Sequence, residues 1–336
     1  MRPGRRPGVS RVLFDHQEVH PMTFPHRLRR GAAWAAGLLA LAALPACGQT
    51  GSASASSAAF ERSAERSASA TAAPKPAAGA FRQLEREFDA RLGVYALDTG
   101  TGRSVAYQAD ERFAYASTFK ALAVGALLQR RGSAGLDKVI TYSQDDLVEY
   151  SPVSENFVET GMSLRELCAA TLWYSDNTAA NLLLEELGGP DGLEKALERL
   201  GDDVTEMDRY EPDLSDGTPG DLRDTSTPRA IAGDLRAFLL GKALDRDERA
   251  LLRTWMETNT TGETLIRAGL PDDWTVADKS GSAGYGGRND VAVVWPDDGG
   301  DPVVLAVMSS RDTQGAERRD ALIAKAATVA VDGLGR

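Results

Sequence analysis

Residues 290–308 read DVAVVWPDDGGDPVVLAVM, two apolar runs separated by a segment of turn-forming residues. The runs, 290–295 and 303–308, are rich in valine, which favours strands, and the Pro, Asp and Gly residues of 296–301 favour a turn. This pattern predicts a β-hairpin near the carboxyl end of the chain. A second hairpin is predicted near the start of the folded part, where residues 92–98 and 104–108 flank Thr99-Gly-Thr-Gly-Arg103.

The stretch between these hairpins carries helix signals. Ser163-Leu-Arg-Glu166 is a capping box, which predicts the start of a helix running through Trp173. Residues 181–187 precede Gly188-Gly189, a signal for the end of a helix. Thr227-Pro228 places an N-cap residue before a helix-initiating proline. A last amphipathic helix is expected over about 316–331.

Strands at both ends of the folded part, with helices between them, predict an α+β fold. We expect an antiparallel sheet of about five strands, built from residues near 92–108 and 275–309 and flanked by helices from both ends of the domain. An all-helical domain of about 116–255 would be inserted into an α/β part of about 81–115 and 256–336, with the functional site in the cleft between the two.

The composition limits the possible classes of function. The 336 residues include 38 Lys and Arg against 49 Asp and Glu, a net charge of −11, which argues against a nucleic-acid-binding protein. All three histidines, His16, His20 and His26, precede Cys47. The chain beyond Cys47 therefore has no imidazole for a Ser-His-Asp triad or a zinc site, and two cysteines supply no thiolate cluster. We expect no metal and no cofactor, and a general base must come from Lys, Glu, Asp or Tyr.

Residues 1–47 are predicted to be an export signal, because an arginine-rich flank precedes the short apolar run Gly31–Ala46. The stretch Leu44-Pro45-Ala46-Cys47 resembles a bacterial lipobox, which would make Cys47 a lipid anchor; plain cleavage and release is the alternative. The Ser- and Ala-rich residues 48–80 predict a flexible tether. We therefore expect a protein that is secreted, or tethered as a lipoprotein to the outer face of the cytoplasmic membrane.

Three short motifs carry candidate chemistry. Ser117-Thr-Phe-Lys120 opens an apolar, helix-prone stretch, and a spacing of three places Ser117 and Lys120 on one helix face, as a serine nucleophile activated by a lysine requires. The structural alternative is a capped core helix. Ser175-Asp176-Asn177 lies between two predicted helices, and Lys279-Ser280-Gly281 at a strand edge; alone, each is explained as well by a cap or a turn. Their joint occurrence by chance is on the order of 0.001.

Together the motifs resemble those of the penicillin-recognising serine enzymes. Glu211-Pro-Asp-Leu-Ser215 is similar to the Glu-x-x-Leu-Asn signature of the omega loop in class A β-lactamases, and residues 261–271 also resemble that class. The resemblance covers about residues 81–336. It implies a class A serine β-lactamase, which hydrolyses the β-lactam ring of penicillins and cephalosporins through a serine acyl-enzyme and confers resistance.

The resemblance implies a role for each site residue. Ser117 would attack the lactam carbonyl, with Lys120 or a water held by Glu211 taking its proton, and Ser175 would pass a proton to the lactam nitrogen. The backbone N–H groups of Ser117 and Ser282 would form the oxyanion hole. The remaining substrate-binding residues would be Asn177 for the side-chain amide, Lys279, Ser280, Ser282 and Arg288 for the carboxylate, and Tyr150 along the cleft.

The omega loop implied by the resemblance has one departure. Arg209 and Asp224 would form the ion pair that closes the loop, and the Glu211–Pro212 peptide bond would be cis. Ser215 stands where the family usually has asparagine, and one hydroxyl replaces only part of an amide's hydrogen bonding. The efficiency of deacylation is therefore open on sequence grounds.

Two other functions share the three motifs. A D-alanyl-D-alanine carboxypeptidase or other penicillin-binding protein would carry them without a productive Glu211. A β-lactam sensor would be acylated and stay acylated, and most such sensors need a membrane-spanning segment, which is not apparent after Cys47. We favour the β-lactamase, acting as a monomer on small-molecule β-lactams with no obligate protein partner.

Overall fold

The structure is a computed structural model that describes residues 75–336. The α-helices are α1 (Lys75–Phe88), α2 (Phe119–Arg131), α3 (Leu164–Trp173), α4 (Asn177–Leu187), α5 (Pro190–Glu198), α6 (Pro228–Leu239), α7 (Arg246–Glu257) and α8 (Asp320–Leu334). The strands are β1 (Arg91–Asp98), β2 (Ser104–Tyr107), β3 (Phe113–Ala114), β4 (Val139–Ile140), β5 (Met162–Ser163), β6 (Thr225–Ser226), β7 (Thr275–Ser282), β8 (Arg288–Trp295) and β9 (Val303–Ser310).

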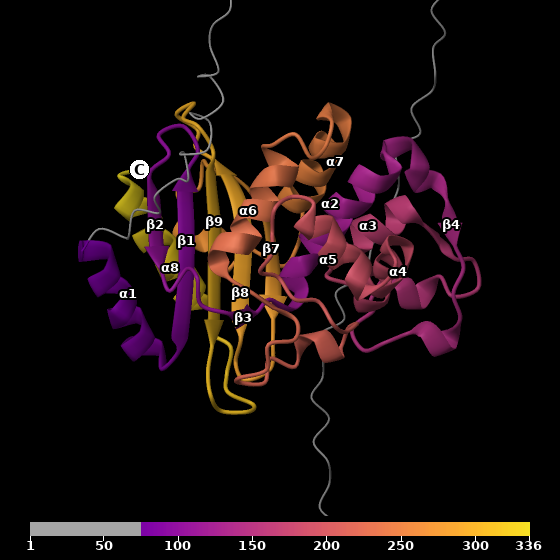
Figure 1. Ribbon diagram of the computed structural model, residues 1–336, viewed down its shortest axis with the longest axis horizontal. Helices are drawn as coiled ribbons and strands as arrows, with labels where there is room; N and C mark the ends of the chain where they lie inside the picture. Colours follow the sequence, from indigo (N-terminus) through magenta and orange to yellow (C-terminus); the bar gives the residue numbers. More distant parts are fainter. Residues whose placement is uncertain (1–74) are drawn as a thin grey trace, which may run out of the picture. The chain divides into compact units, whose positions relative to one another are not determined.

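Five strands form one antiparallel sheet in the order β2-β1-β9-β8-β7 (Figure 1). β1 pairs with β9, with Leu92 opposite Ser309, so segments from the two ends of the domain are neighbours in the sheet. β7 is an edge strand, and its free side faces the helical part of the domain. The predicted α+β fold with a five-stranded antiparallel sheet is confirmed.

Helices cover both faces of the sheet. α1 and α8 pack against one face, where the alternate residues Leu92, Val94 and Ala96 of β1 join the apolar core. α6 covers the other face, and at Gly93 a Cβ atom would lie 2.4 Å from the ring of Phe113 and 2.8 Å from Cγ of Pro228. Because β8 and β9 are covered on both faces, their sequences are nearly continuous apolar runs.

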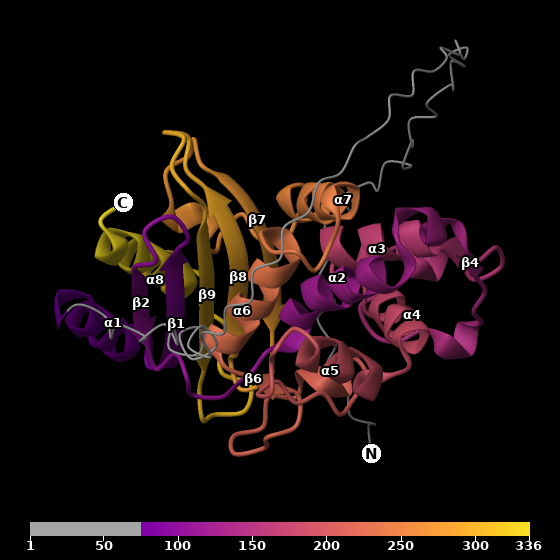
Figure 2. The same ribbon diagram turned by 45° about the horizontal axis from the view of Figure 1, so that its top comes forward.

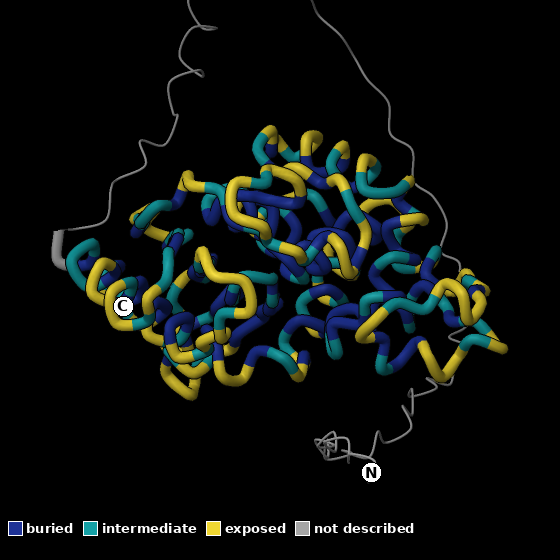
Figure 3. Tube along the Cα trace, turned by 90° about the horizontal axis from the view of Figure 1, so that it is seen from below, coloured by how far each residue is buried: buried dark blue, intermediate teal, exposed yellow. Residues whose placement is uncertain are grey.

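α2 is the central helix of the part beside β7. Its residues from Phe119 to Leu128 are all buried, as expected for a helix that is apolar on every side. The surrounding helices α3, α4, α5 and α7 contact it (Figure 2). Exposed positions gather in the loops and on the outer turns of these helices, whereas the sheet and α2 are largely buried (Figure 3).

The helix signals mark the observed boundaries well. Ser163 caps α3 through the predicted box, accepting a hydrogen bond from the backbone of Glu166. α4 ends at Leu187, where Gly188 adopts a φ of 101°, a conformation that glycine adopts without strain. Thr227 caps α6. The last helix starts at Asp320, later than the expected position near 316, because Arg319 is still extended, with φ −128° and ψ 94°.

Two expected boundaries are wrong. α1 begins at Lys75, inside the segment 48–80 expected to be a tether, because Ala77 already belongs to the buried stripe that continues with Phe81 and Leu84. The span 116–255 is not an all-helical insertion: it contains β6 and the short β4–β5 ribbon, and its helix α6 packs on the sheet.

The predicted export signal, Cys47 and most of the predicted tether lie outside the described residues. Within residues 75–336, no helix is long and apolar enough to cross a membrane.

Candidate active site

The three sequence motifs meet at one pocket of about 430 Å³ between β7, the start of α2 and the omega loop. Most of the predicted site residues line it, namely Ser117, Tyr150, Ser175, Asn177, Glu211, Ser215, Ser280, Ser282 and Arg288. Lys120 and Lys279 are fully buried beneath its floor. A second hollow, of about 520 Å³, lies on the other side of the omega loop and contains none of the three motifs, so the chemistry belongs to the first pocket.

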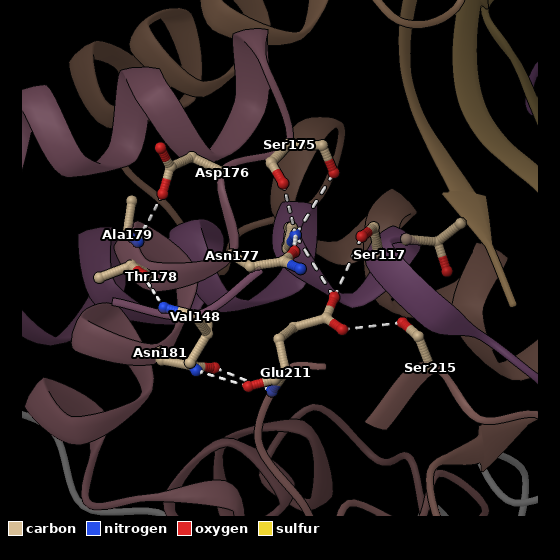
Figure 4. A network of polar contacts seen from close by, with 12 residues as sticks. Ser117, Val148, Ser175, Asp176, Asn177, Thr178, Ala179, Asn181, Glu211 and Ser215 are labelled. Carbon is tan, nitrogen blue, oxygen red and sulfur yellow. Dashed lines mark hydrogen bonds and ion pairs between the residues drawn. The ribbon is translucent and has the colours of Figure 1, made fainter. Parts of the chain in front are cut away.

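Ser117 lies in a short 3-10 turn, Ala116–Thr118, that leads directly into α2. Its Oγ donates a hydrogen bond to Oε1 of Glu211 at 3.1 Å (Figure 4). Nζ of Lys120 lies 3.3 Å from the same oxygen. One carboxylate oxygen therefore receives both the serine hydroxyl and the lysine ammonium group.

Gly281 explains why the third motif ends in glycine. A Cβ atom at this position would lie 2.8 Å from the backbone oxygen of Tyr115 and 3.1 Å from the backbone nitrogen of Thr118. Strand β7 can therefore lie against the backbone on both sides of Ser117 only because residue 281 has no side chain. Asn289 of β8 adds to this contact by donating to the carbonyl oxygens of Ala114 and Tyr115, at 2.8 and 3.2 Å.

Lys120 is completely buried among oxygen atoms. Its Nζ donates to the carbonyl oxygen of Ser175 at 2.7 Å and to Oδ1 of Asn177 at 2.5 Å, and it lies 3.3 Å from Oγ of Ser175. Burial lowers the pKa of Lys120, and the negative charge of Glu211 opposes that shift. A lysine with a lowered pKa gives up and takes back a proton more readily near neutral pH than an exposed one.

Lys279 lies on the opposite side of Ser175. Its Nζ donates to Oγ of Ser175 at 3.1 Å and to the carbonyl oxygen of Ser280 at 2.8 Å. Burial, and next the positive charge of Lys120, lower the pKa of Lys279 to about 7. The hydroxyl of Ser175 thus lies between two buried amines and contacts both.

Asp176 forms the helix cap that was the alternative explanation of the second motif. Its buried carboxylate caps α4 by accepting from the backbone N–H of Ala179 at 2.8 Å, and it accepts from the backbone N–H groups of Val153 and Ser154, both at 2.9 Å. These bonds tie the loop that carries Tyr150 to the start of α4. The capping role and the functional role of this motif therefore coexist, because its neighbours Ser175 and Asn177 face the pocket.

Glu211 is held at its backbone and at its side chain. Asn181 forms a pair of hydrogen bonds to the Glu211 backbone, accepting from its N–H at 2.9 Å and donating to its carbonyl oxygen at 2.8 Å. Oγ of Ser215 donates to Oε2 of Glu211 at 2.8 Å (Figure 4). The Glu211–Pro212 peptide bond is cis, as predicted.

The predicted ion pair at the neck of the omega loop is present. Nε of Arg209 contacts Oδ2 of Asp224 at 2.5 Å, and Asp224 is fully buried. The other oxygen of Asp224 accepts from the backbone N–H groups of Asp208 and Arg209, at 2.9 and 3.0 Å. Arg209 also reaches Asp216 at 2.8 Å, so one guanidinium group joins both sides of the loop.

Polar side chains also gather at the carboxyl end of β7. Ser280 donates to Oγ1 of Thr261 at 2.8 Å. Arg288 donates to Oγ of Ser282 through Nη1 at 2.8 Å, and its Nε contacts Asp320 at 2.7 Å. Two hydroxyls and a guanidinium group therefore stand side by side along the edge of this strand.

Tyr150 lines the pocket from the opposite rim. Its side chain is 59% exposed, its φ of 65° is unusual for a residue other than glycine, and its carbonyl oxygen accepts from the N–H of Asn177 at 3.0 Å. The backbone contact fixes the position of the tyrosine relative to Asn177.

The sequence interpretation missed the pocket-lining residues Glu149, Thr261 and Arg318, and also Asn181, which holds the backbone of Glu211. Asn181 had a usable signal, because it lies four residues after Asn177 on the same helix face. Thr261 belongs to the segment already noted for its resemblance to class A enzymes. Glu149 and Arg318 lie in polar segments in which nothing distinguishes them from other surface charges.

The described residues offer neither a metal-binding cluster nor an exposed thiol. Within residues 75–336, no cluster of three or more His, Cys, Asp or Glu side chains is arranged to hold a metal ion. Cys168 is buried on α3, and burial raises the pKa of its thiol, so it has little thiolate with which to react.

Fold and site together define a class of protein: an α+β serine hydrolase whose candidate nucleophile contacts a glutamate, which in turn contacts a buried lysine, instead of a histidine. The sequence pattern of the Beta-lactamase enzyme family matches residues 76–334. The β-lactamase of Amycolatopsis lactamdurans is 59% identical over 255 residues, which cover 76% of this chain and 84% of that protein. The β-lactamase of Bacillus licheniformis is 56% identical over 254 residues, which cover 76% and 82%.

Solved structures give the same result. A halotolerant bacterial β-lactamase is 52% identical with a TM-score of 0.75, covering 76% of this chain and 98% of that one. The class A β-lactamase from Clostridium kluyveri is 49% identical with a TM-score of 0.76, covering 77% and 98%. The chain belongs to the β-lactamase enzyme family, as a class A serine β-lactamase.

Proposed function

We propose that this pocket hydrolyses the β-lactam ring of penicillins and cephalosporins in two steps, through an acyl-enzyme on Ser117. This is the reaction by which a β-lactamase confers resistance. The observation that carries the proposal is the shared contact at Oε1 of Glu211, which lies 3.1 Å from the hydroxyl of Ser117 and 3.3 Å from the ammonium group of Lys120. A serine without histidine needs a nearby base, and this pair supplies one.

In the acylation step, Oγ of Ser117 attacks the lactam carbonyl carbon and its proton passes to the Lys120–Glu211 pair. The C–N bond of the ring then breaks, and the nitrogen needs a proton. Ser175 is suited to deliver it, because its Oγ is contacted by Lys120 on one side and by Lys279 on the other. The proton that leaves Ser117 can thus return to the substrate through amines and one hydroxyl.

The substrate is held along the edge of β7. The backbone N–H groups of Ser117 and Ser282 form the oxyanion hole, and the close contact at Gly281 supports this assignment by bringing the two segments together. Lys279, Ser280, Ser282 and Arg288 bind the ring carboxylate. Asn177 binds the amide of the acyl side chain, and Tyr150 borders the opposite rim of the pocket.

In the deacylation step, Glu211 removes a proton from a water molecule that attacks the ester carbonyl of the acyl-enzyme. Its position supports this role because backbone bonds to Asn181 and a side-chain bond to Ser215 hold the carboxylate toward Ser117. Ser215 replaces one donor of the usual asparagine, so the loop keeps a polar contact at this carboxylate oxygen.

The test is hydrolysis of benzylpenicillin and a chromogenic cephalosporin by the purified protein. We expect Ser117→Ala to abolish both activities and to form no covalent adduct, whereas Ser133→Ala, which changes a half-buried serine that does not line the pocket, should behave like the parent. Release of D-alanine from an acyl-D-alanyl-D-alanine peptide at a higher rate than β-lactam hydrolysis would instead support the carboxypeptidase. A Ser117→Ala variant that still hydrolyses both substrates would overturn the assignment of Ser117 as the nucleophile.

We also propose that residues 1–47 direct export, that Cys47 carries a lipid anchor, and that the enzyme acts as a monomer. The export signal and the anchor are proposed from the basic flank, the apolar run and the lipobox-like sequence before Cys47. The monomer is proposed from the resemblance to class A β-lactamases alone. Mass spectrometry of the mature amino terminus tests the anchor directly. We expect a lipidated Cys47, and release of the protein from membranes in Cys47→Ser. An unmodified amino terminus beyond Cys47 would refute the lipid anchor. Light scattering of the purified protein tests the monomer.

A further inference from the structure

Two arginines line the active-site pocket, and their charges are balanced differently. Arg288 contacts the carboxylate of Asp320 at 2.7 Å, and the hydroxyl of Ser282 at 2.8 Å. Arg318, which is exposed, has no carboxylate within ion-pair distance among the described residues. Its sequence neighbour Glu317 contacts Arg319 instead, at 3.2 Å. Arg318 is therefore a pocket-lining cation whose charge is not matched by a contacting acid.

A backbone contact fixes the place of Arg318 along the pocket. Its Nε donates to the carbonyl oxygen of Ala283 at 3.3 Å. Ala283 directly follows Ser282, the last residue of β7 and the residue that Arg288 contacts. Arg318 thus stands just beyond the strand end where the ring carboxylate is proposed to bind.

We propose that Arg318 forms a second anion subsite, which favours β-lactams that carry an additional negative group next to the ring carboxylate. This inference rests on the proposed function, because it uses the substrate orientation given there. In a cephalosporin, the C3 substituent is bonded to the carbon next to the one that bears the carboxylate. A substrate whose carboxylate lies at Ser280, Ser282 and Arg288 therefore extends its C3 substituent toward the end of β7.

The chemistry of the arginine suits this role. A guanidinium group keeps its charge at all relevant pH values and presents several N–H donors in one plane, so it pairs well with a delocalised or carboxylate anion. Its contact with Ala283 uses Nε, which leaves the two terminal nitrogens for a ligand. Because the side chain is exposed, water and salt should weaken the interaction.

The test compares two cephalosporins with the same oxyimino acyl side chain, one with a neutral acetoxymethyl group at C3 and one with an acidic triazinone. Apparent inhibition constants are measured against hydrolysis of a chromogenic cephalosporin, so neither compound has to be turned over. For Arg318→Gln, we expect the constant for the acidic compound to rise about 2- to 5-fold, with the neutral compound nearly unchanged. In the parent, raising the salt concentration should weaken the binding of the acidic compound more than that of the neutral one.

Arg319→Gln is the matched control. Arg319 is the sequence neighbour of Arg318, but it already has an acid partner and does not line the pocket. Equal changes for both compounds in Arg318→Gln, or the same selective change in Arg319→Gln, would overturn the subsite. Failure of the proposed function has a separate signature: the parent would then not hydrolyse the chromogenic substrate in a Ser117-dependent way.

Discussion

The carboxylate of Glu211 accepts a hydrogen bond directly from the hydroxyl of Ser117, across 94 residues of sequence, with Oγ and Oε1 3.1 Å apart. Ser117 comes from the turn that opens α2, and Glu211 from the omega loop. The second carboxylate oxygen accepts from Ser215. Each oxygen of Glu211 therefore has its own hydroxyl donor, and the backbone of the same residue is fixed by Asn181.

The contact between Ser215 and Glu211 should matter mainly for the second step of the reaction. Ser215→Ala removes an O–H donor at 2.8 Å from Oε2. A hydrogen bond to a charged group contributes about 1.5 kcal/mol or more, so we expect about a tenfold slower deacylation. Ser215→Asn, which keeps a donor, is the control. Rapid-quench measurement of the acyl-enzyme separates the steps, and an unchanged deacylation rate in Ser215→Ala would contradict the assignment.

The ion pair of Arg209 with buried Asp224 should hold the omega loop closed. Arg209→Ala leaves the carboxylate of Asp224 buried without its cation, which typically costs about 3 kcal/mol or more of folding stability. We expect lower stability in urea and a larger loss in deacylation than in acylation. Arg223→Ala removes an exposed arginine of the same loop, paired with Asp221, and should change little. Equal losses in the two steps for Arg209→Ala would count against the loop's role.

The charge of Lys279 should set an alkaline limb in the activity. Burial, and next the charge of Lys120, lower the pKa of Lys279 to about 7, so the cation that we propose binds the substrate carboxylate is present below that pH and lost above it. The profile of kcat/KM, which reports the free enzyme, should fall above about pH 7. A bound carboxylate favours the charged lysine, so the limb of kcat should lie at higher pH.

Lys279→Arg tests this explanation of the pH profile, because an arginine stays charged throughout the range. The alkaline limb of kcat/KM near pH 7 should then disappear, even where the overall rate is lower. A limb of the same shape in Lys279→Arg would assign it to another group, with Lys120 as the next candidate, because burial lowers its pKa as well.

A buried acid on α6 should make stability depend on pH. Burial, and next the charge of Asp202, raise the pKa of Asp234 from 3.8 to about 9, and Oδ2 of Asp234 has no hydrogen-bond partner among the described residues. The folded state therefore holds a proton that the unfolded state has released. The resulting stability is fully present below about pH 4 and is lost as the pH rises toward 9, at up to about 1.4 kcal/mol per pH unit.

Asp234→Asn should therefore flatten the dependence of unfolding free energy on pH, as measured by urea unfolding between about pH 5 and 9. Asp203→Asn, which removes an exposed acid nearby, should leave the slope as it is. If the slope in Asp234→Asn matched that of the parent, the buried carboxyl would not be its source.

Much of the fold follows from local sequence signals. The valine-rich runs of β8 and β9 and the caps at Ser163 and Thr227 mark elements whose ends are decided by neighbouring residues. The start of α1 was missed because its first turn has the same Ala-rich composition as the segment before it, and only burial of Ala77 against the core distinguishes it. The position of α6 was missed because an amphipathic helix does not encode which surface it covers.

In the candidate site, too, residues with local sequence signals were predicted and residues that act through long-range packing were not. Ser117, Lys120 and Lys279 were found because their motifs place the chemical groups at short, fixed spacings. Asn181 was missed, and Gly281 was noted only as the last residue of a motif, because both act through long-range contacts with the backbone of Glu211 and of the Ser117 segment. Such contacts depend on how distant segments pack, so the sequence can mark the positions but not the contacts that they make.

The most direct measurement of the central claim follows the covalent state of Ser117 in Glu211→Gln. This substitution keeps the shape of the side chain but removes the proposed base for deacylation, while we expect that Ser117 can still attack with help from Lys120. We predict that deacylation slows about 100- to 10,000-fold, so that a benzylpenicillin adduct accumulates on Ser117 and survives to intact mass measurement. Asp213→Asn, on the exposed surface of the same loop, is the control and should show no lasting adduct. Hydrolysis of benzylpenicillin by Glu211→Gln at the parent's rate would contradict Glu211 as the deacylation base, and an equally long-lived adduct in the parent would contradict the hydrolytic function itself.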